Sequence, residues 1–207
     1  SIQNAIPSNV TLVAVSKTKP LEAILEAYAL GLRDFGENRA VELVEKAKAL
    51  PDDIRWHAIG HLQRNKASLV APISSLIHSV DSIRLYDELS KHAGEKLDVL
   101  IQIHIADEQN KHGFYPDDFK KILDAGDDLH SPNIKIRGLM GMATFTDNHS
   151  QITNEFKALR TLFDEISPTM GLDFGTLSMG MSGDWKIAID EGSTLIRVGS
   201  AIFGSRN

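Results

Sequence analysis

Lys17 is the first residue whose type and position could support chemistry. It follows residues 11–15 (TLVAV), a run of apolar and β-branched residues typical of a strand buried on both faces. Partial burial at the end of such a strand favours the neutral amine, which can attack an aldehyde. The alternative is a solvated charge at a strand end. Lys17 alone favours this simpler interpretation, so the choice depends on where the other polar residues fall.

Two stretches near the C-terminus resemble the two halves of one phosphate site. Residues 178–183 (SMGMSG) follow a predicted strand, and Gly199 with Ser200 follows another and opens a short helical piece. Backbone N–H groups at a helix N-terminus point at an anion, and glycine lets the backbone approach closely. Tight turns alone would also explain these glycines. The prediction of a phosphate site therefore rests on the two stretches occurring together.

Arg197 is predicted to point into the same cavity as this phosphate site. Side chains alternate along a strand, so Leu195, Arg197 and Gly199 share one face. A partly buried guanidinium needs an acceptor. A structural ion pair with a carboxylate of the barrel explains the spacing equally well.

The chain alternates strictly between strand-like and helix-like patterns. Strands are expected at 11–15, 34–38, 55–60, 76–80, 98–105, 134–142, 176–179 and 194–198. Helices are expected at 20–30, 40–50, 65–70, 83–93, 117–129, 149–166 and 183–191, with a short helical piece after residue 199. Asp81 is the expected N-cap of the helix over 83–93. Alternation of this kind favours a parallel sheet with crossover helices. Eight strands predict one closed (β/α)8 barrel over residues 1–207, with an open doubly wound sheet as the alternative.

Polar or glycine residues, together with Met142, gather at the carboxyl ends of the expected strands, where barrel enzymes place their active sites. These positions are Lys17, Asn38, His57 with Gly60, Ser79, Met142, Ser178 with Ser182, and Arg197 with Gly199 and Ser200. Random placement would scatter such groups over both ends of the barrel. This clustering favours a functional interpretation of Lys17.

Composition excludes several classes of protein. The 207 residues carry a net charge of −6 without a basic run, which disfavours a nucleic-acid or membrane surface. No apolar run is long enough for a bilayer, and no signal peptide opens the chain. There is no cysteine, which excludes disulfides and fits a cytoplasmic location.

The sequence predicts no metal site. His57 and His61 are four residues apart, but they flank the end of a strand and so do not share a helix face. No carboxylate has matching ligand spacing, and the chain has no thiolate to offer.

Seven motifs together resemble the pyridoxal-phosphate homeostasis protein family. They are AVSKTKP (14–20), FGEN (35–38), WHAIGHLQRNK (56–66), HSVD (78–81), RGLM (137–140), SMGMS (178–182) and STLIRVGSAIFG (193–204). The resemblance runs from about Val10 to the end of the chain. It implies the barrel fold of the alanine racemase N-terminal domain, with pyridoxal 5′-phosphate (PLP) as the cofactor.

The resemblance also assigns roles to residues. Lys17 matches the lysine that forms a Schiff base with PLP, and Arg197 matches the arginine beside the pyridine nitrogen. Asn38 is expected beside the ring, with His57, Ser79 and Met142 nearby. The expected phosphate ligands are Ser182, Gly199 and Ser200, with Met181 adjoining them.

The function expected from this family is that of a monomeric PLP carrier or regulator, with PLP-dependent apo-enzymes as partners. Two alternatives remain: a PLP-dependent amino-acid racemase, and a class I aldolase that uses Lys17 directly. Racemisation needs a proton removed on one face of the substrate and returned on the other, and Lys17 can serve one face. The chain ends soon after the eighth expected strand, so we expect no second domain to supply a tyrosine. Tyr115, in the long loop after residue 105, is the one tyrosine that could reach the mouth.

Overall fold

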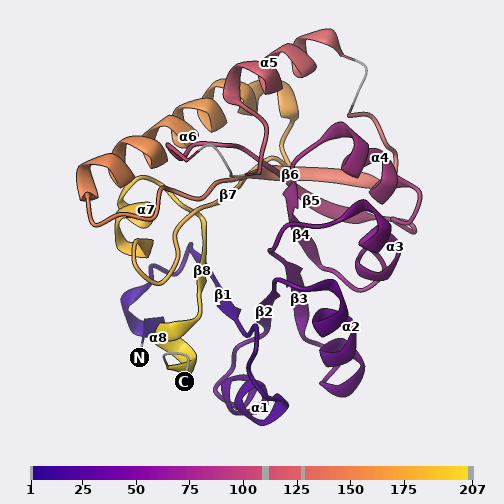
Figure 1. Cartoon of the computed structure of the whole chain (residues 1–207), viewed down its shortest axis with the longest axis vertical. Coiled ribbons are helices and arrows are strands. Elements are labelled where there is room, and N and C mark those ends of the chain that lie inside the picture. The colour runs from indigo at the N-terminus through magenta and orange to yellow at the C-terminus, as the bar shows by residue number, and fades with distance from the viewer. Residues whose placement is uncertain (1, 109–111, 127–128, 205–207) are drawn as a thin grey trace.

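Eight parallel strands form a closed barrel in which each strand pairs with its neighbours in sequence and β8 pairs with β1 (Figure 1). The computed structural model describes residues 2–108, 112–126 and 129–204. The strands are β1 (Thr11–Val15), β2 (Asp34–Glu37), β3 (Arg55–Ala58), β4 (Leu76–Val80), β5 (Leu97–Gln102), β6 (Ile134–Met140), β7 (Thr176–Ser178) and β8 (Leu195–Val198). The predicted (β/α)8 barrel is thus confirmed.

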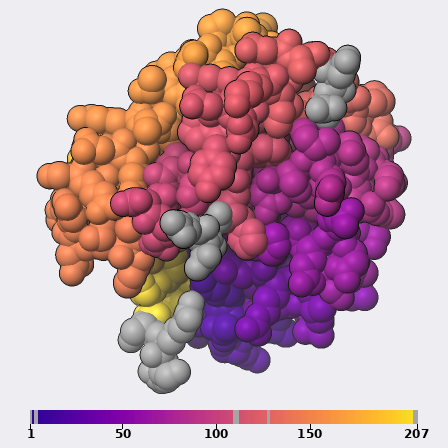
Figure 2. Space-filling view, turned by 45° about the horizontal axis from the view of Figure 1, so that its top comes forward, coloured from indigo at the N-terminus to yellow at the C-terminus, as the bar shows by residue number. Residues whose placement is uncertain are grey.

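Helices follow the strands and form the outer layer of the barrel. They are α1 (Leu21–Ala29), α2 (Ala40–Ala49), α3 (Ala67–Val70), α4 (Ile83–Ser90), α5 (Pro116–Ala125), α6 (His149–Met170), α7 (Trp185–Asp190) and α8 (Ser200–Phe203). Two 3₁₀ turns, η1 (Ile2–Ala5) and η2 (Arg64–Lys66), complete the described elements. Figure 2 shows this outer layer, from the indigo and purple N-terminal half to the orange helix α6. None of the described helices combines the length and apolar character needed to cross a membrane.

Several element boundaries differ from those expected. Helix α4 begins at Ile83, but its N-cap is Ser82, whose hydroxyl accepts from the Leu85 N–H, and not Asp81 as the sequence suggests. Helix α6 continues through Pro168 to Met170, beyond the expected end at residue 166. The helix expected over 183–191 is confined to α7 because the loop after β7 uses residues 179–184. That loop forms part of the site below.

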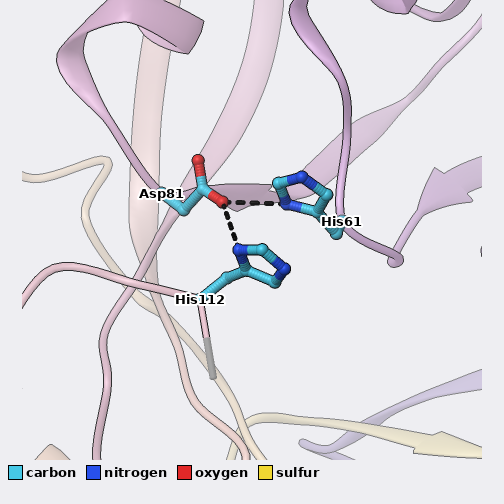
Figure 3. Close-up of side chains that lie close together, drawn as sticks. All are labelled: His61, Asp81 and His112. Atoms are coloured by element: carbon cyan, nitrogen blue, oxygen red, sulfur yellow. Dashed lines mark hydrogen bonds and ion pairs between the residues drawn. The ribbon is translucent and has the colours of Figure 1, made fainter. Parts of the chain in front are cut away.

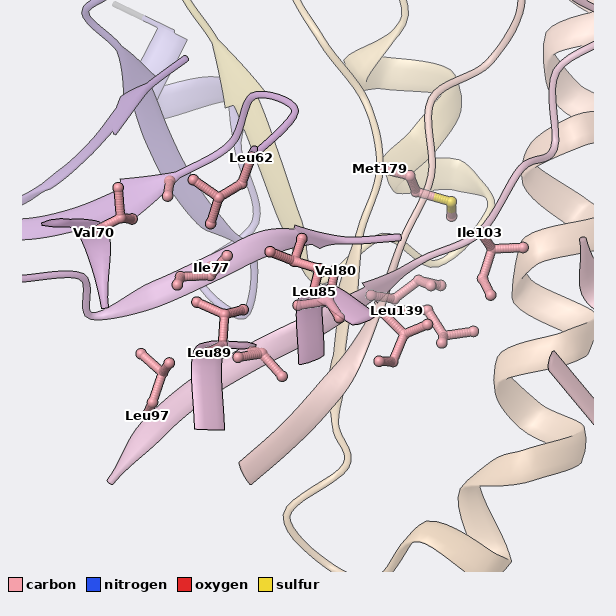
Figure 4. Packing of buried hydrophobic residues seen from close by; sticks show 14 of the residues in the cluster. Leu62, Val70, Ile77, Val80, Leu85, Leu89, Leu97, Ile103, Leu139 and Met179 are labelled. Atoms are coloured by element: carbon pink, nitrogen blue, oxygen red, sulfur yellow. The ribbon is translucent and has the colours of Figure 1, made fainter. Parts of the chain in front are cut away.

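The main core lies between the barrel wall and the helices. Phe35, Phe119 and Phe156 are fully buried there. Figure 4 shows part of this cluster, with Ile77 of β4 near Leu89 of α4. Burying a large apolar side chain contributes about 1.5–3 kcal/mol relative to leaving it exposed. This layer therefore supplies the rigidity that holds the strand ends in place.

A second, smaller apolar cluster fills the barrel interior. It consists of Val13, Leu76, Leu100, Met140 and Leu195, one residue from each of five strands. Inward-facing residues of such barrels stack in layers, so the interior is packed and is not a pore. The partly buried Met142 packs onto this layer. Met142 thus marks the level at which the packed interior gives way to the cavity above it.

Candidate functional site

A cavity of about 700 Å³ opens at the carboxyl ends of the strands. Its size lies within the roughly 300–1,000 Å³ typical of small-molecule sites. The lining includes eight of the ten predicted site residues: Lys17, Asn38, Met142, Met181, Ser182, Arg197, Gly199 and Ser200. The structure therefore brings together residues that are up to 183 positions apart in the sequence, from Lys17 to Ser200.

The loop that carries Lys17 is fixed by a buried network beneath it. Lys46 of α2 donates to the Ser16 carbonyl at 2.8 Å and to Glu37 Oε1 at 2.7 Å. The Ser16 hydroxyl donates to the same Glu37 oxygen at 2.6 Å. Glu42 then accepts the Thr18 N–H at 2.6 Å. Lys17, half-buried between Ser16 and Thr18, is held from both sides.

Backbone strain marks the same loop. Thr18 has a φ of 64°, the left-handed region that residues other than glycine rarely adopt. Burial raises the pKa of Glu37, and the hydrogen bonds from Lys46 and Ser16 offset part of that rise. Lys46 was not among the site residues expected from the sequence. A signal was present, because Lys46 lies three residues after Leu43, on the apolar face of its helix.

Asn38 lines the cavity, and Gly60 in the loop after β3 packs directly against its backbone. A Cβ atom at Gly60 would overlap the carbonyl oxygen of Asn38. Only glycine permits this approach of the two loops. Asn38 is exposed at the cavity lining, one residue beyond β2.

The two predicted halves of the phosphate site meet at the end of the barrel. The Gly199 N–H donates to the Ser182 hydroxyl at 3.2 Å, and Ser200 begins helix α8. Gly180, with a φ of 99°, allows the turn after β7, where a Cβ would come within 2.6 Å of the Ala188 Cβ. The Met181 N–H donates to Asp184 at 2.5 Å and closes that turn. Hydroxyl and N–H donors are thus concentrated in one corner of the cavity.

Arg197 is buried at the cavity wall and held by neutral oxygens. One guanidinium nitrogen donates to the Ser178 carbonyl at 3.0 Å and to the Ser178 hydroxyl, and the other donates to the Gly141 carbonyl at 3.1 Å. Burial lowers the pKa of Arg197 to about 10, with Asp184 acting in the opposite direction. Neutral acceptors, and not the carboxylate of a structural ion pair, therefore orient this guanidinium.

A chain of buried hydrogen bonds leads from Arg197 through the barrel interior. The Ser178 hydroxyl lies 3.0 Å from His78 Nδ1, and His78 Nε2 lies 2.9 Å from His57 Nδ1. His57 Nε2 lies 3.0 Å from the Asp34 carboxylate at the start of β2. One set of directions satisfies every group, with the Ser178 hydroxyl and both imidazoles each donating toward Asp34. The chain therefore links the guanidinium to the opposite end of the barrel.

Two members of this chain, His78 in its middle and Asp34 at its end, differ in their ionisation. Burial lowers the pKa of His78 to well below its usual value, and the nearby His57 and Arg197 add to this effect. Burial alone would raise the pKa of Asp34, but hydrogen bonds and charge from His57 and Arg55 lower it to about 2. Asp34 therefore carries a charge at neutral pH, whereas His78 is neutral.

His57 and Ser79 are the two predicted site residues that the structure does not bring to the cavity lining. His57 lies below the cavity, in the hydrogen-bond chain. Strand β3 ends at Ala58, and Ile59 occupies the lining instead. The Ser79 hydroxyl is buried, with no hydrogen-bond partner among the described residues. A direct contact of either residue with a ligand remains a prediction without support from this geometry.

The segment between β6 and α6 lines the cavity but was not expected there from the sequence. Residues 144–147 of this loop and His149 at the start of α6 belong to the lining. Glu155 of α6 holds this loop by accepting from the N–H and the hydroxyl of Thr144, both at 2.6 Å. The signal was a polar segment between an expected strand and an expected helix, the usual place for binding residues in such barrels.

The donor set fits a molecule with a carbonyl group, an aromatic ring and an anionic group. Lys17 offers an amine, the corner at Ser182 and Gly199 offers neutral donors, and Arg197 offers a cationic donor between them. Met142 and Ile59 supply apolar surface to the same cavity. These groups could bind and orient such a molecule without any metal ligand.

Comparison with known proteins agrees with this architecture. The family model for the alanine racemase N-terminal domain matches residues 1–207. The barrel with a lysine at the end of β1 thus belongs to this class of domain. Proteins named pyridoxal phosphate homeostasis protein are 42% identical over 97% of the chain in Pseudomonas aeruginosa and 39% identical over 95% in Homo sapiens. The aligned regions cover 86% of the Pseudomonas aeruginosa protein and 76% of the Homo sapiens protein. The chain belongs to the pyridoxal phosphate homeostasis protein family.

Solved structures show the same relationship. PipY from Synechococcus elongatus, solved without PLP, superposes with a TM-score of 0.91 at 39% identity and covers 98% of this chain and 96% of its own. The structure of PipY with PLP bound superposes with a TM-score of 0.87 at 38% identity, covering the same shares. An alanine racemase from Clostridium difficile has a TM-score of 0.78 at 15% identity, over 55% of its length, which indicates a shared fold alone.

Proposed function

We propose that this chain binds PLP in the cavity above the barrel and holds it for supply to other proteins. The observation that carries the proposal is the meeting of Lys17, Arg197 and the Ser182–Gly199 corner in one cavity. The names of the relatives and the PLP-bound structure of PipY support the same cofactor.

Each group has a distinct role in the proposed complex. PLP supplies an aldehyde, a pyridine ring and a phosphate. The Lys17 amine holds the aldehyde as a Schiff base, because its loop fixes it at the cavity edge. Backbone N–H groups of Gly199 and Ser200, with the Ser182 hydroxyl, bind the phosphate. Met181 adjoins the phosphate, and Asn38 and Met142 lie beside the ring.

Arg197 is proposed to donate a hydrogen bond to the pyridine nitrogen. A guanidinium has no acceptor and keeps its proton at neutral pH, even with its pKa at about 10. The ring nitrogen therefore stays unprotonated and withdraws electrons weakly. This arrangement suits the storage of PLP better than chemistry that needs a strong electron sink.

The geometry favours a carrier over a racemase. Racemisation needs one group that removes a proton on one face of the substrate and a second that returns a proton on the other. In the described ranges no tyrosine lines the cavity, and Tyr115 is 57% exposed and packs against the His104 ring. The class I aldolase remains less favoured, because such an enzyme has no use for Arg197 in the cavity.

The proposal extends to the oligomeric state, cellular location and partners of the protein. Residues 1–207 form one PLP-binding barrel domain, active as a monomer in the cytoplasm. PLP-dependent apo-enzymes are its partners, and it has no role on nucleic acids or membranes. Its net charge of −6 is consistent with the last point.

The experiment combines an activity assay with a transfer assay. The PLP-loaded protein is incubated with L-alanine in deuterium oxide, and exchange of the α-hydrogen is followed by NMR. We expect exchange far slower than ordinary enzyme turnover of about 1–10³ s⁻¹. We also expect PLP to appear in an added apo-enzyme, measured by recovery of that enzyme's activity. Exchange at ordinary enzyme rates would overturn the carrier proposal.

A further inference from the structure

Three side chains from successive loops gather at the carboxyl end of the barrel, outside the cavity lining. His61 follows β3, Asp81 ends β4, and His112 belongs to the loop after β5. Figure 3 shows both imidazole rings directed at the same carboxylate. His61 Nδ1 lies 3.0 Å from Asp81 Oδ2, and His112 Nδ1 lies 3.6 Å from the same oxygen. All three candidate ligand atoms lie within 4.8 Å of one another.

A hydrogen bond explains only half of this arrangement. The 3.0 Å separation suits an N–H···O bond from His61, but 3.6 Å from His112 is too long for one. The two rings nevertheless stack, with centroids 3.6 Å apart and planes within 10°. Hydrogen bonding to Asp81 therefore accounts for the position of the first ring alone, whereas the second ring stacks on it with its Nδ1 near the same oxygen.

A divalent ion would account for both rings. Zinc binds imidazole nitrogen and carboxylate oxygen at about 2.0–2.2 Å, so tetrahedral ligands lie roughly 3.3 Å apart. The two distances to Asp81 Oδ2, 3.0 and 3.6 Å, fall on either side of that spacing. To bind a shared ion, the exposed rings would rotate out of their parallel stack until both Nδ1 lone pairs point at it.

The side chains of the three residues differ in solvent exposure, and this difference suits a site that an ion enters from solvent. The Asp81 side chain is 11% exposed, whereas those of His61 and His112 are 43% and 54% exposed. The carboxylate is thus held in the protein, and the imidazoles leave a path for an ion and for a water ligand.

Neighbouring groups orient two of the three ligands. The Ser82 hydroxyl donates to Asp81 Oδ1 at 3.3 Å, which leaves Oδ2 for the histidines. The buried Gln102 side chain donates to the His112 carbonyl at 3.0 Å and fixes that part of the loop. Supporting contacts of this kind are typical around metal ligands.

We propose that His61, Asp81 and His112 form a site for a divalent transition-metal ion of the zinc class, with one open coordination position. Imidazole and carboxylate ligands suit zinc, cobalt and nickel. The ion would connect the loops after β3, β4 and β5. No local pattern indicates this site, because the ligands lie on three loops, with 20 residues from His61 to Asp81 and 31 from Asp81 to His112.

The test uses the full chain without a histidine tag, titrated with Co²⁺ and followed by visible absorption, and with Zn²⁺ followed by calorimetry. We expect one ion per chain and the strong visible bands of four-coordinate Co²⁺. His112→Ala is the main variant, because its exposed side chain contributes little to folding. His61→Ala and Asp81→Asn complete the set, each with folding checked by circular dichroism. Each should weaken metal binding by about tenfold or more, because replacing even a residue that only hydrogen-bonds to a metal ligand has an effect of that size.

The matched control is His92→Ala. His92 also lies beside a carboxylate, 3.3 Å from Glu88, but it is not part of the three-ligand cluster. It should bind metal as the unaltered chain does, and Zn²⁺ should raise the melting temperature of both equally. The proposal is overturned by an absence of 1:1 binding, by unchanged affinity in His112→Ala, or by equal weakening in His92→Ala. Repeating the titration on Lys17→Ala separates this outcome from any failure of the PLP proposal.

Discussion

At the scale of single residues, the proposed contact of Arg197 with the pyridine nitrogen predicts how the absorption of bound PLP depends on this side chain. Arg197→Glu replaces a donor that keeps its proton with a group that favours a protonated ring nitrogen. We expect the visible absorption band of bound PLP to shift, and to keep that shift across the pH range in which the protein stays folded. Arg197→Gln, which is neutral, is the control and should give a smaller shift. An unchanged spectrum with PLP still bound would contradict the placement of Arg197 at the ring nitrogen.

Asp34 gives a pH-dependent prediction at the same scale. Its pKa is lowered from 3.8 to about 2 in the folded protein. The resulting stabilisation is fully present above the unfolded pKa and is lost as pH falls from about 4 to about 2. A shift of this size corresponds to about 2 kcal/mol. Asp34→Asn should therefore reduce the free energy of unfolding near neutral pH by about that amount.

The check on Asp34 is a series of urea denaturations at decreasing pH. The difference between the unaltered chain and Asp34→Asn should shrink across the window from pH 4 to pH 2. Asp173→Asn is the control, because Asp173 is half-exposed and surface ion pairs contribute only about 0–1 kcal/mol. A difference that stays constant over this window would show that Asp34 acts through something other than its charge.

Sequence reasoning located most of the cavity residues but not the residues beneath them. Lys17, Asn38 and Arg197 could be found because polar groups at strand ends stand out against apolar strands. His57 and Ser79 were expected at the cavity because they lie in the carboxyl-terminal parts of the strands expected over 55–60 and 76–80. Inward-facing residues stack in layers, and only the top layer reaches the cavity. Pairings such as that of His57 with His78 depend on register between strands, which no local pattern specifies.

At the scale of elements, the loop after β1 depends on the buried network beneath it. Lys46→Met would leave Glu37 buried without its cation. Removing one partner of a buried ion pair typically costs about 3–5 kcal/mol. We expect a loss of this order in urea denaturation, together with a smaller fraction of Lys17 modified by PLP. Lys48→Met, an exposed position on the same helix, should change neither quantity.

A double variant separates charge from packing in this network. Glu37→Gln combined with Lys46→Met removes both charges and should recover much of the stability lost in Lys46→Met. The Lys17 loop should remain loose, because the bond from Lys46 to the Ser16 carbonyl is also lost. If the two variants are equally unstable, the network contributes through packing and not through its charges.

Element boundaries were the weakest part of the sequence prediction. The type and order of the elements followed from apolar periodicity, which the core enforces over many residues. Their ends depend on single hydrogen bonds. Ser82 caps α4 in place of Asp81, and Asp184 closes the turn that delays the start of α7. Both depend on the local backbone conformation, which a sequence pattern does not determine.

At the scale of the whole molecule, closure of the barrel brings residues that are distant in the sequence to one cavity at the carboxyl ends of the strands. Alternating strands and helices predicted a parallel sheet because parallel strands require crossover connections, and the eight strands predicted its closure. The candidate metal site shows where this reasoning stops. Its ligands lie on three loops whose proximity follows only from the closed barrel. The same closure brings Lys17 to the Ser182–Gly199 corner.

The central claim is that Lys17 holds PLP, and Lys19 is the natural competitor. Lys19 lines the same cavity, but its amine donates to the carbonyls of Phe203 and Gly204 at 3.0 and 3.4 Å. The PLP-loaded protein is reduced with borohydride and digested, and the modified lysine is located by mass spectrometry. The account predicts a pyridoxyl group on Lys17, absent from Lys17→Ala. A pyridoxyl group on Lys19 in the unaltered chain, or undiminished labelling of Lys17→Ala, would contradict it.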